Sequence, residues 1–209
     1  MSKLFDYNNP VWQFVGKVAD FAFLTVLWAL CSSPIVTIGA STTALYYVMF
    51  KVSEDKEGYL FKTFAKAFKE NLKQTMPITI IMFLFGLFLG IDLFYYYHVD
   101  TQSAKVLFWV ILVFSIVYVF MLTLIFPLTA RLETTVKNLF LMSFMVSIKN
   151  FSWVMLMVVT TVCVVAFSIF VFWPVLIIAA GLIAWIHSII LIKVIFPKYK
   201  WNEEDREKG

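Results

Sequence analysis

Apolar residues fall into long, nearly unbroken runs along this chain. Four runs cover 75–97, 106–126, 151–172 and 174–192. Asp92 and His187 are the two ionisable residues, among Asp, Glu, Lys, Arg and His, that interrupt these runs. A helix needs about 20 predominantly apolar residues to cross the hydrocarbon core of a bilayer. Each run therefore predicts a transmembrane helix.

The stretch between Lys17 and Lys51 has a different pattern. It contains two shorter apolar pieces, 18–33 and 35–50, which are separated around Pro34. Proline suits the first position of a helix, so Pro34 is expected to begin the second arm of a helical hairpin. This hairpin gives six transmembrane helices in total. Two alternatives stay open: five spans with the N-terminus outside, or a kinked or re-entrant element at 39–43, where small residues allow close backbone approach.

Composition supports the same class of protein. Of the 209 residues, 62% are hydrophobic and 14% are charged, and the mean hydropathy is +0.88. These values are far from those of ordinary soluble domains. We predict an all-α, polytopic membrane protein with a single transmembrane domain over 1–209.

The basic residues predict the orientation of that domain. In the six-span arrangement, sixteen of the seventeen Lys and Arg residues lie on one side, and Lys105 alone lies on the other. Cytoplasmic loops carry the excess of Lys and Arg in membrane proteins. Both termini are therefore expected in the cytoplasm. The five-span alternative moves only Lys3 and Lys17, so the charges orient the main body better than the first hairpin.

The cytoplasmic connection at 51–74 has the spacing of an amphipathic helix. Aromatic and basic residues alternate at helical intervals, and six of them form a candidate surface for lipid or for a partner: Phe61, Lys62, Phe64, Lys66, Phe68 and Lys69. Such a helix suits a membrane surface with anionic headgroups. Its two interpretations are an interfacial helix that connects spans and a docking surface for a cytoplasmic protein. At the other end of the chain, 198–209 is expected to be a polar, solvated tail.

Ionisable residues at membrane depth are functional candidates because an unpaired charge there is costly. The candidates are Lys17, Asp20, Asp92 and His187. Lys17 and Asp20 are three residues apart and are expected to pair on one helical face. His187 is the most interesting of the set, although a packing histidine held by hydrogen bonds is the simpler interpretation.

Four glycines within the apolar segments are candidate sites of close helix packing: Gly39, Gly86, Gly90 and Gly181. Gly86 and Gly90 form a G-x-x-x-G pair, which lets two helices approach closely. Packing within the chain is a simpler explanation than dimerisation.

Sequence motifs of soluble enzymes are absent from the chain. It has no phosphate-binding G-x-x-x-x-G-K-[ST] loop, no H-E-x-x-H motif and no G-x-S-x-G motif, and its two histidines are predicted on opposite sides of the bilayer. We therefore expect no enzymatic activity, cofactor or metal. Nucleic-acid binding is not expected either, because topology and surface lipids account for the net charge of +4.

The first third of the chain resembles the YesL family of bacterial membrane proteins, a family without a settled activity. The resemblance rests on Gly16, Lys17 and Asp20, then 27–31, 34–47, Gly58, Tyr59, Phe64, Phe68, Lys69 and Asn71. Family members often have Asn where this chain has Thr25. The resemblance implies a location in the bacterial cell membrane and an association with carbohydrate uptake.

Two functions follow as expectations. The first is a non-catalytic accessory subunit beside the permease and ATPase subunits of a carbohydrate ABC importer. The second is an independent transporter of a small molecule or ion. Transporters concentrate polar or broken-helix elements near the middle of the membrane, and only 39–43 suggests such an element. The resemblance favours the accessory role.

Overall fold

The computed structural model describes residues 10–54 and 59–201, with side chains from residue 15 onward. All regular structure in this part of the chain is helical, as predicted. The elements are α1 (Pro10–Cys31), the 3₁₀ turn η2 (Ile35–Thr37), α2 (Ile38–Ser53), α3 (Leu60–His98), α4 (Gln102–Arg131), α5 (Val136–Lys149), α6 (Phe151–Phe170), the 3₁₀ turn η3 (Trp173–Val175), α7 (Leu176–Ile190), the π-helix η4 (Leu191–Ile195) and α8 (Phe196–Tyr199).

Five helical stretches within the described residues are long and apolar enough to cross a membrane. They are Ile35–Ser53, Leu60–His98, Gln102–Arg131, Phe151–Phe170 and Trp173–Tyr199. Four of these correspond to the four long apolar runs of the sequence, although the helix at Phe151–Phe170 ends two residues before its run does. The fifth contains the second arm of the predicted first hairpin, and α1 precedes it. The chain is thus a helical membrane protein.

The break in the first hairpin lies where the sequence predicts it. α1 ends at Cys31, and helix resumes at Ile35 after Pro34. Side chains on both sides hold the turn closed: the Thr37 hydroxyl donates to the Cys31 carbonyl at 2.6 Å, and the Ser32 and Ser41 hydroxyls are 2.6 Å apart. The small and hydroxylated residues near 39–43 therefore begin a regular helix packed against its neighbours.

The predicted connection at 51–74 is not a separate helix. α2 continues to Ser53, residues 55–58 lie outside the described part, and α3 then runs without interruption for 39 residues. At 1.5 Å per residue α3 is about 59 Å long, roughly twice the hydrocarbon core. The buried residues Phe64, Asn71 and Ile78 keep one helical phase across position 74, so no boundary forms there. Pro77 inside α3 removes one backbone donor without ending the helix.

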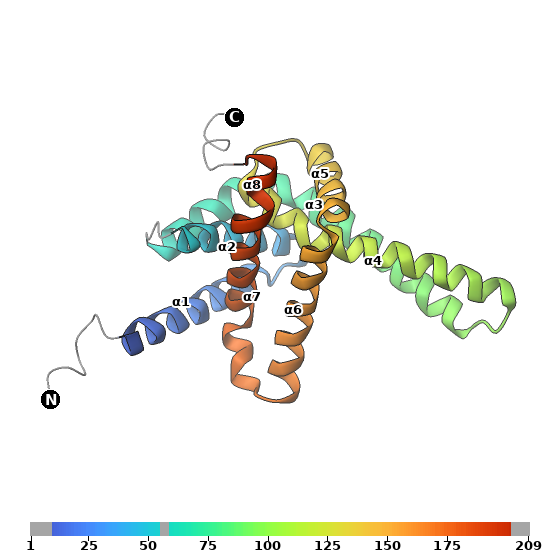
Figure 1. Cartoon of the computed structure of the whole chain (residues 1–209), viewed down its shortest axis with the longest axis horizontal. Coiled ribbons are helices and arrows are strands. Elements are labelled where there is room, and N and C mark those ends of the chain that lie inside the picture. Colours follow the sequence, from blue (N-terminus) through green and yellow to red (C-terminus); the bar gives the residue numbers. More distant parts are fainter. Residues whose placement is uncertain (1–9, 55–58, 202–209) are drawn as a thin grey trace, which may run out of the picture.

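Two long hairpins diverge from a shared core (Figure 1). The α3–α4 hairpin extends to one side, and the α6–α7 hairpin extends in a different direction, with their turns far apart. The core lies where the hairpins meet, and α2 packs there against α3, α4 and α7. Its fully buried side chains include Met49, Ile78, Leu124, Met157 and Leu191. The outer halves of the hairpins expose most of their apolar side chains.

The first residues of the polar tail predicted at 198–209 are held against the body of the protein. α8 covers Phe196–Tyr199, and the Lys198 ammonium donates to the Asn150 side-chain oxygen at 3.0 Å. Tyr199 and Trp201 stack with ring centroids 4.7 Å apart. These contacts anchor 198–201 to the body of the protein. Residues 202–209 lie outside the described part.

Candidate functional site

His187 lies at the junction of α2, α6 and α7 and is 2% exposed. Its Nδ1 atom is 2.7 Å from the Tyr46 hydroxyl on α2. Its Nε2 atom is 2.9 Å from the Met157 carbonyl oxygen on α6. The Tyr46 and His187 rings are also stacked, with centroids 6.2 Å apart. One imidazole therefore connects three helices.

The hydrogen bonds determine which protons this imidazole carries. A carbonyl oxygen can only accept, so His187 Nε2 must carry a hydrogen that it donates to Met157. In the neutral ring Nδ1 is then an acceptor, and the Tyr46 hydroxyl donates to it. In a doubly protonated ring Nδ1 would donate to the Tyr46 oxygen instead. The geometry fits neutral His187, which places no charge in the buried core.

Two threonines on α6 complete the polar cluster. The hydroxyls of Thr160 and Thr161 lie 2.8 and 3.0 Å from the Met157 carbonyl oxygen and donate to it. Both are also 3.3 Å from His187 Nε2. We call Tyr46, Met157, Thr160, Thr161 and His187 the His187 cluster. It forms a short donor chain from Tyr46 through His187 to a backbone carbonyl.

A second polar contact joins α1 to α7. The Thr25 hydroxyl donates to the Phe21 carbonyl at 2.7 Å and accepts from the Gly181 amide at 3.0 Å. A Cβ atom at Gly181 would lie 2.8 Å from the Phe21 carbonyl oxygen. The backbones of the two helices are thus in close contact at Gly181, and a side chain there would push them apart.

The other three glycines have distinct surroundings. A Cβ atom on Gly39 would collide with the Thr79 hydroxyl and the Phe126 ring, and one on Gly86 would collide with the Tyr118 hydroxyl. Gly90 has no heavy atom within 4 Å of such a position. Gly86 therefore packs within the α3–α4 hairpin, whereas Gly90 borders open space.

The end of the molecule opposite the two hairpin turns is held by charges. An Arg131 guanidinium nitrogen donates to the Glu54 carboxylate at 3.0 Å, with the two side chains only 10% and 17% exposed. The guanidinium also lies over the Phe196 ring, 5.4 Å from its centroid. We call Glu54, Arg131, Asn150, Phe196 and Lys198 the charged end. It joins α2, α4, α5 and α8.

The first part of α3 carries the predicted lipid or partner surface, and one of its members is misplaced. Phe64 is 2% exposed and belongs to the core, because it points toward the same side as Ala67 and Asn71. Phe61 is 59% exposed, and Phe68 is partly buried. Lys62, Lys66 and Lys69 are exposed. The candidate surface is therefore the lysine side with Phe61.

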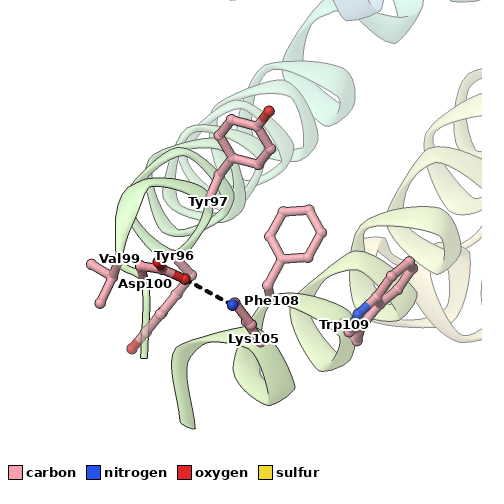
Figure 2. Close-up of a pocket in the computed structure, with 7 residues that line it drawn as sticks. All are labelled: Tyr96, Tyr97, Val99, Asp100, Lys105, Phe108 and Trp109. Carbon is pink, nitrogen blue, oxygen red and sulfur yellow. Dashed lines mark ion pairs between the residues drawn. The ribbon is translucent and has the colours of Figure 1, made fainter. Parts of the chain in front are cut away.

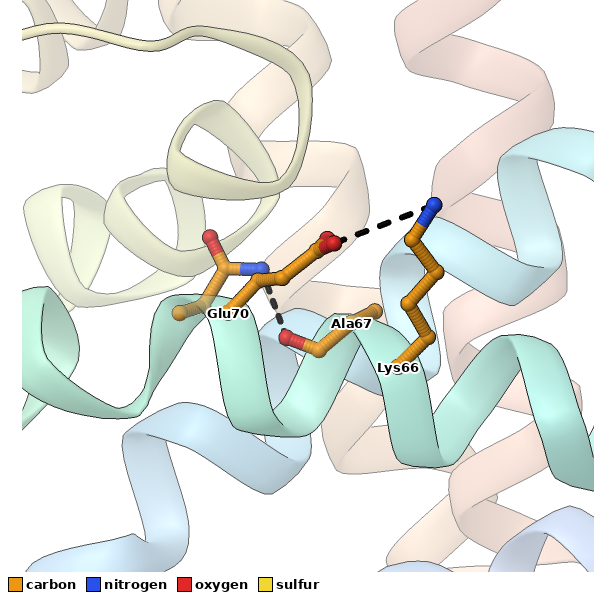
Figure 3. Close-up of polar contacts among 4 residues, drawn as sticks. Lys66, Ala67 and Glu70 are labelled. Atoms are coloured by element: carbon orange, nitrogen blue, oxygen red, sulfur yellow. Dashed lines mark hydrogen bonds and ion pairs between the residues drawn. The ribbon is translucent and has the colours of Figure 1, made fainter.

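Local contacts fix the two sides of this part of α3 (Figure 3). On the exposed side, Lys66 pairs with Glu70 one turn later at 3.8 Å. On the buried side, the Asn71 amide donates to the Ala67 carbonyl at 2.7 Å. The ion pair is solvated and weak, so the lysines are available to an anionic partner.

The remaining ionisable candidates lie away from the His187 cluster. Lys17 and Asp20 are exposed on α1, and Asp92 is half-buried in the outer half of α3. The structure does not bring these residues together with His187. Within the described residues, no group of three or more His, Cys, Asp or Glu side chains is placed to hold a metal ion.

The comparisons with known proteins match one segment. Residues 21–93 match the family model described as DUF624, a protein of unknown function. This segment contains the second half of α1, all of α2 and most of α3. Comparison with curated proteins finds no match, and comparison with solved structures finds none either.

The DUF624 segment supplies only part of each polar contact. It contains Tyr46, but His187 and Thr160 lie well beyond it. It also contains Thr25, but not Gly181. Sequence reasoning missed Tyr46, Thr25 and the two threonines because hydroxyls are common on packed membrane helices. Arg131 could have been recognised from the sequence as the first charged residue after the apolar run 106–126.

Proposed function

We propose that the protein is a non-catalytic accessory subunit that packs beside the permeases of a carbohydrate ABC importer in the bacterial cell membrane. The observation that carries this proposal is the divergence of the two hairpins (Figure 1), which leaves the sides of α4 that do not pack against α3 open to other helices in the outer half of the hairpin. Large apolar side chains line those sides, including Val113 and Phe114 at 61% exposure each. Such sides suit lateral packing against other membrane helices.

The polar interior supports a structural role. The ring nitrogens of His187 and the hydroxyls of Tyr46, Thr160 and Thr161 all have hydrogen-bond partners within the cluster. A neutral, satisfied histidine stabilises helix contacts at little electrostatic cost. The cluster is thus suited to fixing α2, α6 and α7 relative to one another. The carbohydrate system itself comes from the YesL resemblance, which overlaps the DUF624 segment.

The proposed topology has six spans, with α1 as the first and both termini in the cytoplasm. Exposed lysines of the first turns of α3 and the cations of the charged end then face the cytoplasm, while Lys105 lies outside. Lys62, Lys66 and Lys69 would contact anionic lipid headgroups or an acidic surface of the ATPase or permease subunits. On this arrangement the amphipathic part of α3 begins at the membrane surface and leads directly into the span.

Purification in a mild detergent tests the accessory role. The full-length protein, tagged at its C-terminus and isolated from its native membranes, should retain permease and ATPase subunits. A photo-crosslinking residue at Val113 should join it to a permease, while the same residue at the buried position Leu124 serves as the matched control. Recovery of a lone monodisperse oligomer, with no crosslink from Val113, would refute the proposal.

An independent transporter is the alternative, and one observation favours it. The His187 cluster is followed within four residues by the π-helix η4, and π-helical segments are frequent at functional sites. A donor chain beside a π-helix could pass protons. Purified protein in liposomes should then carry a proton-coupled flux that is lost in His187→Gln. Equal flux in the wild type and the variant would exclude this role for the cluster.

A further inference from the structure

A small recess opens at the turn between α3 and α4. It has a volume of about 270 Å³, and Figure 2 shows its aromatic and charged lining. The residues that matter are Tyr96, Tyr97, Asp100, Lys105, Phe108 and Trp109. Binding sites for drug-sized molecules begin at about 300 Å³. The recess therefore suits a small polar group rather than a large ligand.

The two charges of the recess are placed against the usual preference of helices. Asp100 follows the C-terminal end of α3, and Lys105 is the fourth residue of α4. Acidic residues normally favour helix N-termini and basic residues C-termini, because of the helix dipole. Here each charge has the same sign as the helix end beside it. The recess thus has one negative and one positive part.

Asp100 and Lys105 compensate for this arrangement by pairing with each other. The Lys105 ammonium is 2.7 Å from the Asp100 carboxylate, and the side chains are 62% and 91% exposed. Figure 2 shows this pair joined across the turn, with Phe108 beside it. Exposed ion pairs contribute little free energy. A ligand that offers a charge to each partner can therefore replace the pair readily.

The aromatic rings of the recess favour a ligand whose positive group is an ammonium. Tyr97 and Phe108 have ring centroids 6.1 Å apart, and Phe108 lies 5.8 Å from Trp109. Tyr97 and Trp109 are 74% and 64% exposed. Aromatic faces attract ammonium groups, and Tyr and Trp are enriched at the level of lipid headgroups. The recess also lies at the end of two apolar helices that are long enough to cross a membrane, which places it at headgroup level if these helices span the bilayer.

We propose that this recess binds the headgroup of a zwitterionic phospholipid. The phosphate lies at Lys105 and the N-terminal amides of α4, where Thr101 already caps the Ala104 amide. The ammonium lies at Asp100 and the aromatic faces. This site is independent of the accessory role, because it requires only that the α3–α4 turn lies at a membrane surface.

Native mass spectrometry of the full-length protein tests the site. Protein exchanged into an equimolar mixture of phosphatidylethanolamine and phosphatidylglycerol should retain the zwitterionic lipid in preference. The double variant D100N/K105Q should lower that retention by about tenfold, as expected from losing two charge-assisted contacts. The control K137Q/K149Q, which removes two exposed cations of α5, should retain the lipid as the wild type does.

A charge swap separates recognition from a merely structural ion pair. D100K/K105D keeps the pair but reverses its polarity, so that each charge suits the helix end beside it. The melting temperature should therefore stay the same or rise slightly, while lipid retention is lost. Unchanged retention in D100K/K105D or in D100N/K105Q would overturn the proposal, as would a preference for phosphatidylglycerol. Binding of soluble phosphoethanolamine as tightly as the lipid would assign the recess to a soluble zwitterion and overturn its assignment to lipid.

Discussion

Tyr46 and His187 are 141 positions apart in the chain, yet the tyrosine hydroxyl donates to the imidazole Nδ1 over 2.7 Å. Because Nε2 donates to the Met157 carbonyl on the opposite side of the ring, this contact ties α2 to α6 through α7. This contact is long-range in the sequence, and no sequence pattern in the two helices indicates that these residues meet. Its removal should therefore affect the whole core rather than one helix.

Tyr46→Phe tests the contribution of this hydrogen bond. The variant keeps the ring but leaves Nδ1 as a buried acceptor without its donor, which typically costs about 1–3 kcal/mol. The apparent melting temperature of the detergent-solubilised protein should fall. Tyr59→Phe, at a tyrosine that is 86% exposed, is the matched control and should melt with the wild type. Equal melting of both variants would show that the hydroxyl does not stabilise the core.

Gly181 and Gly90 offer a matched comparison of helix packing. Gly181→Ala places a Cβ atom 2.8 Å from the Phe21 carbonyl oxygen, whereas Gly90→Ala meets nothing within 4 Å. Overpacking of this kind costs about 1–3 kcal/mol, and alanine at an open helical position is favourable by up to about 1 kcal/mol. The melting temperature should thus fall for G181A and stay the same or rise for G90A. The opposite order would refute the close α1–α7 contact.

The Arg131–Glu54 pair should behave as a buried ion pair. Arg131→Met leaves the carboxylate poorly compensated, which typically costs about 3–5 kcal/mol. The double variant R131M/E54L removes both charges and should recover most of that loss. The stabilities of the two single variants and the double variant, measured by thermal melting, give the coupling free energy between the two side chains. A double variant as unstable as the sum of the two single variants would show that the charges do not interact.

The predicted surface of α3 can be separated from its buried side. Phe64→Ser removes a core side chain and should destabilise the protein by about 3–5 kcal/mol, the range of large-to-small core changes. Phe61→Ser changes an exposed residue, so the melting temperature should stay unchanged. If this side of α3 binds a partner protein, the same variant should weaken that complex. Co-purification and melting are measured for both variants. Retention of the complex in F61S would favour a lipid contact for this side of the helix.

Cysteine labelling tests the topology in a variant without Cys31 and Cys163. A membrane-impermeant maleimide should modify position 101 from outside intact cells and position 55 only in inverted vesicles. Position 6 should react like position 55 if the chain has six spans. External labelling at position 6, with the other two unchanged, would establish five spans. Reversed labelling at 55 and 101 would refute the orientation.

Local sequence was a reliable guide to where helices lie. The run at 151–172 predicts a helix beginning where α6 begins, and Cys31 and Pro34 mark the break between α1 and the next helical turn. Such features depend on hydropathy and on the missing amide of proline. Both act over a few residues and are visible without knowledge of the partners.

The connection at 51–74 shows why amphipathic spacing was not sufficient. The spacing correctly separates the exposed lysines from an apolar side, but it does not tell whether that side faces lipid or protein. Phe64 is buried in the core, where α3 packs against α2 and α4, and the sequence of α3 does not show which of its sides these helices cover. The same limitation hid the continuity of α3 beyond residue 74.

The sequence by itself determined that this protein is helical, that it belongs in a membrane, and where its apolar helical segments lie along the chain. Those properties follow from runs of apolar side chains, because each helix satisfies its own backbone hydrogen bonds. Tertiary structure alone decided that Tyr46 meets His187, that Thr25 meets Gly181, and that the two hairpins diverge. These outcomes depend on how each helix is rotated against its neighbours, and that rotation is set by contacts between residues far apart in the chain.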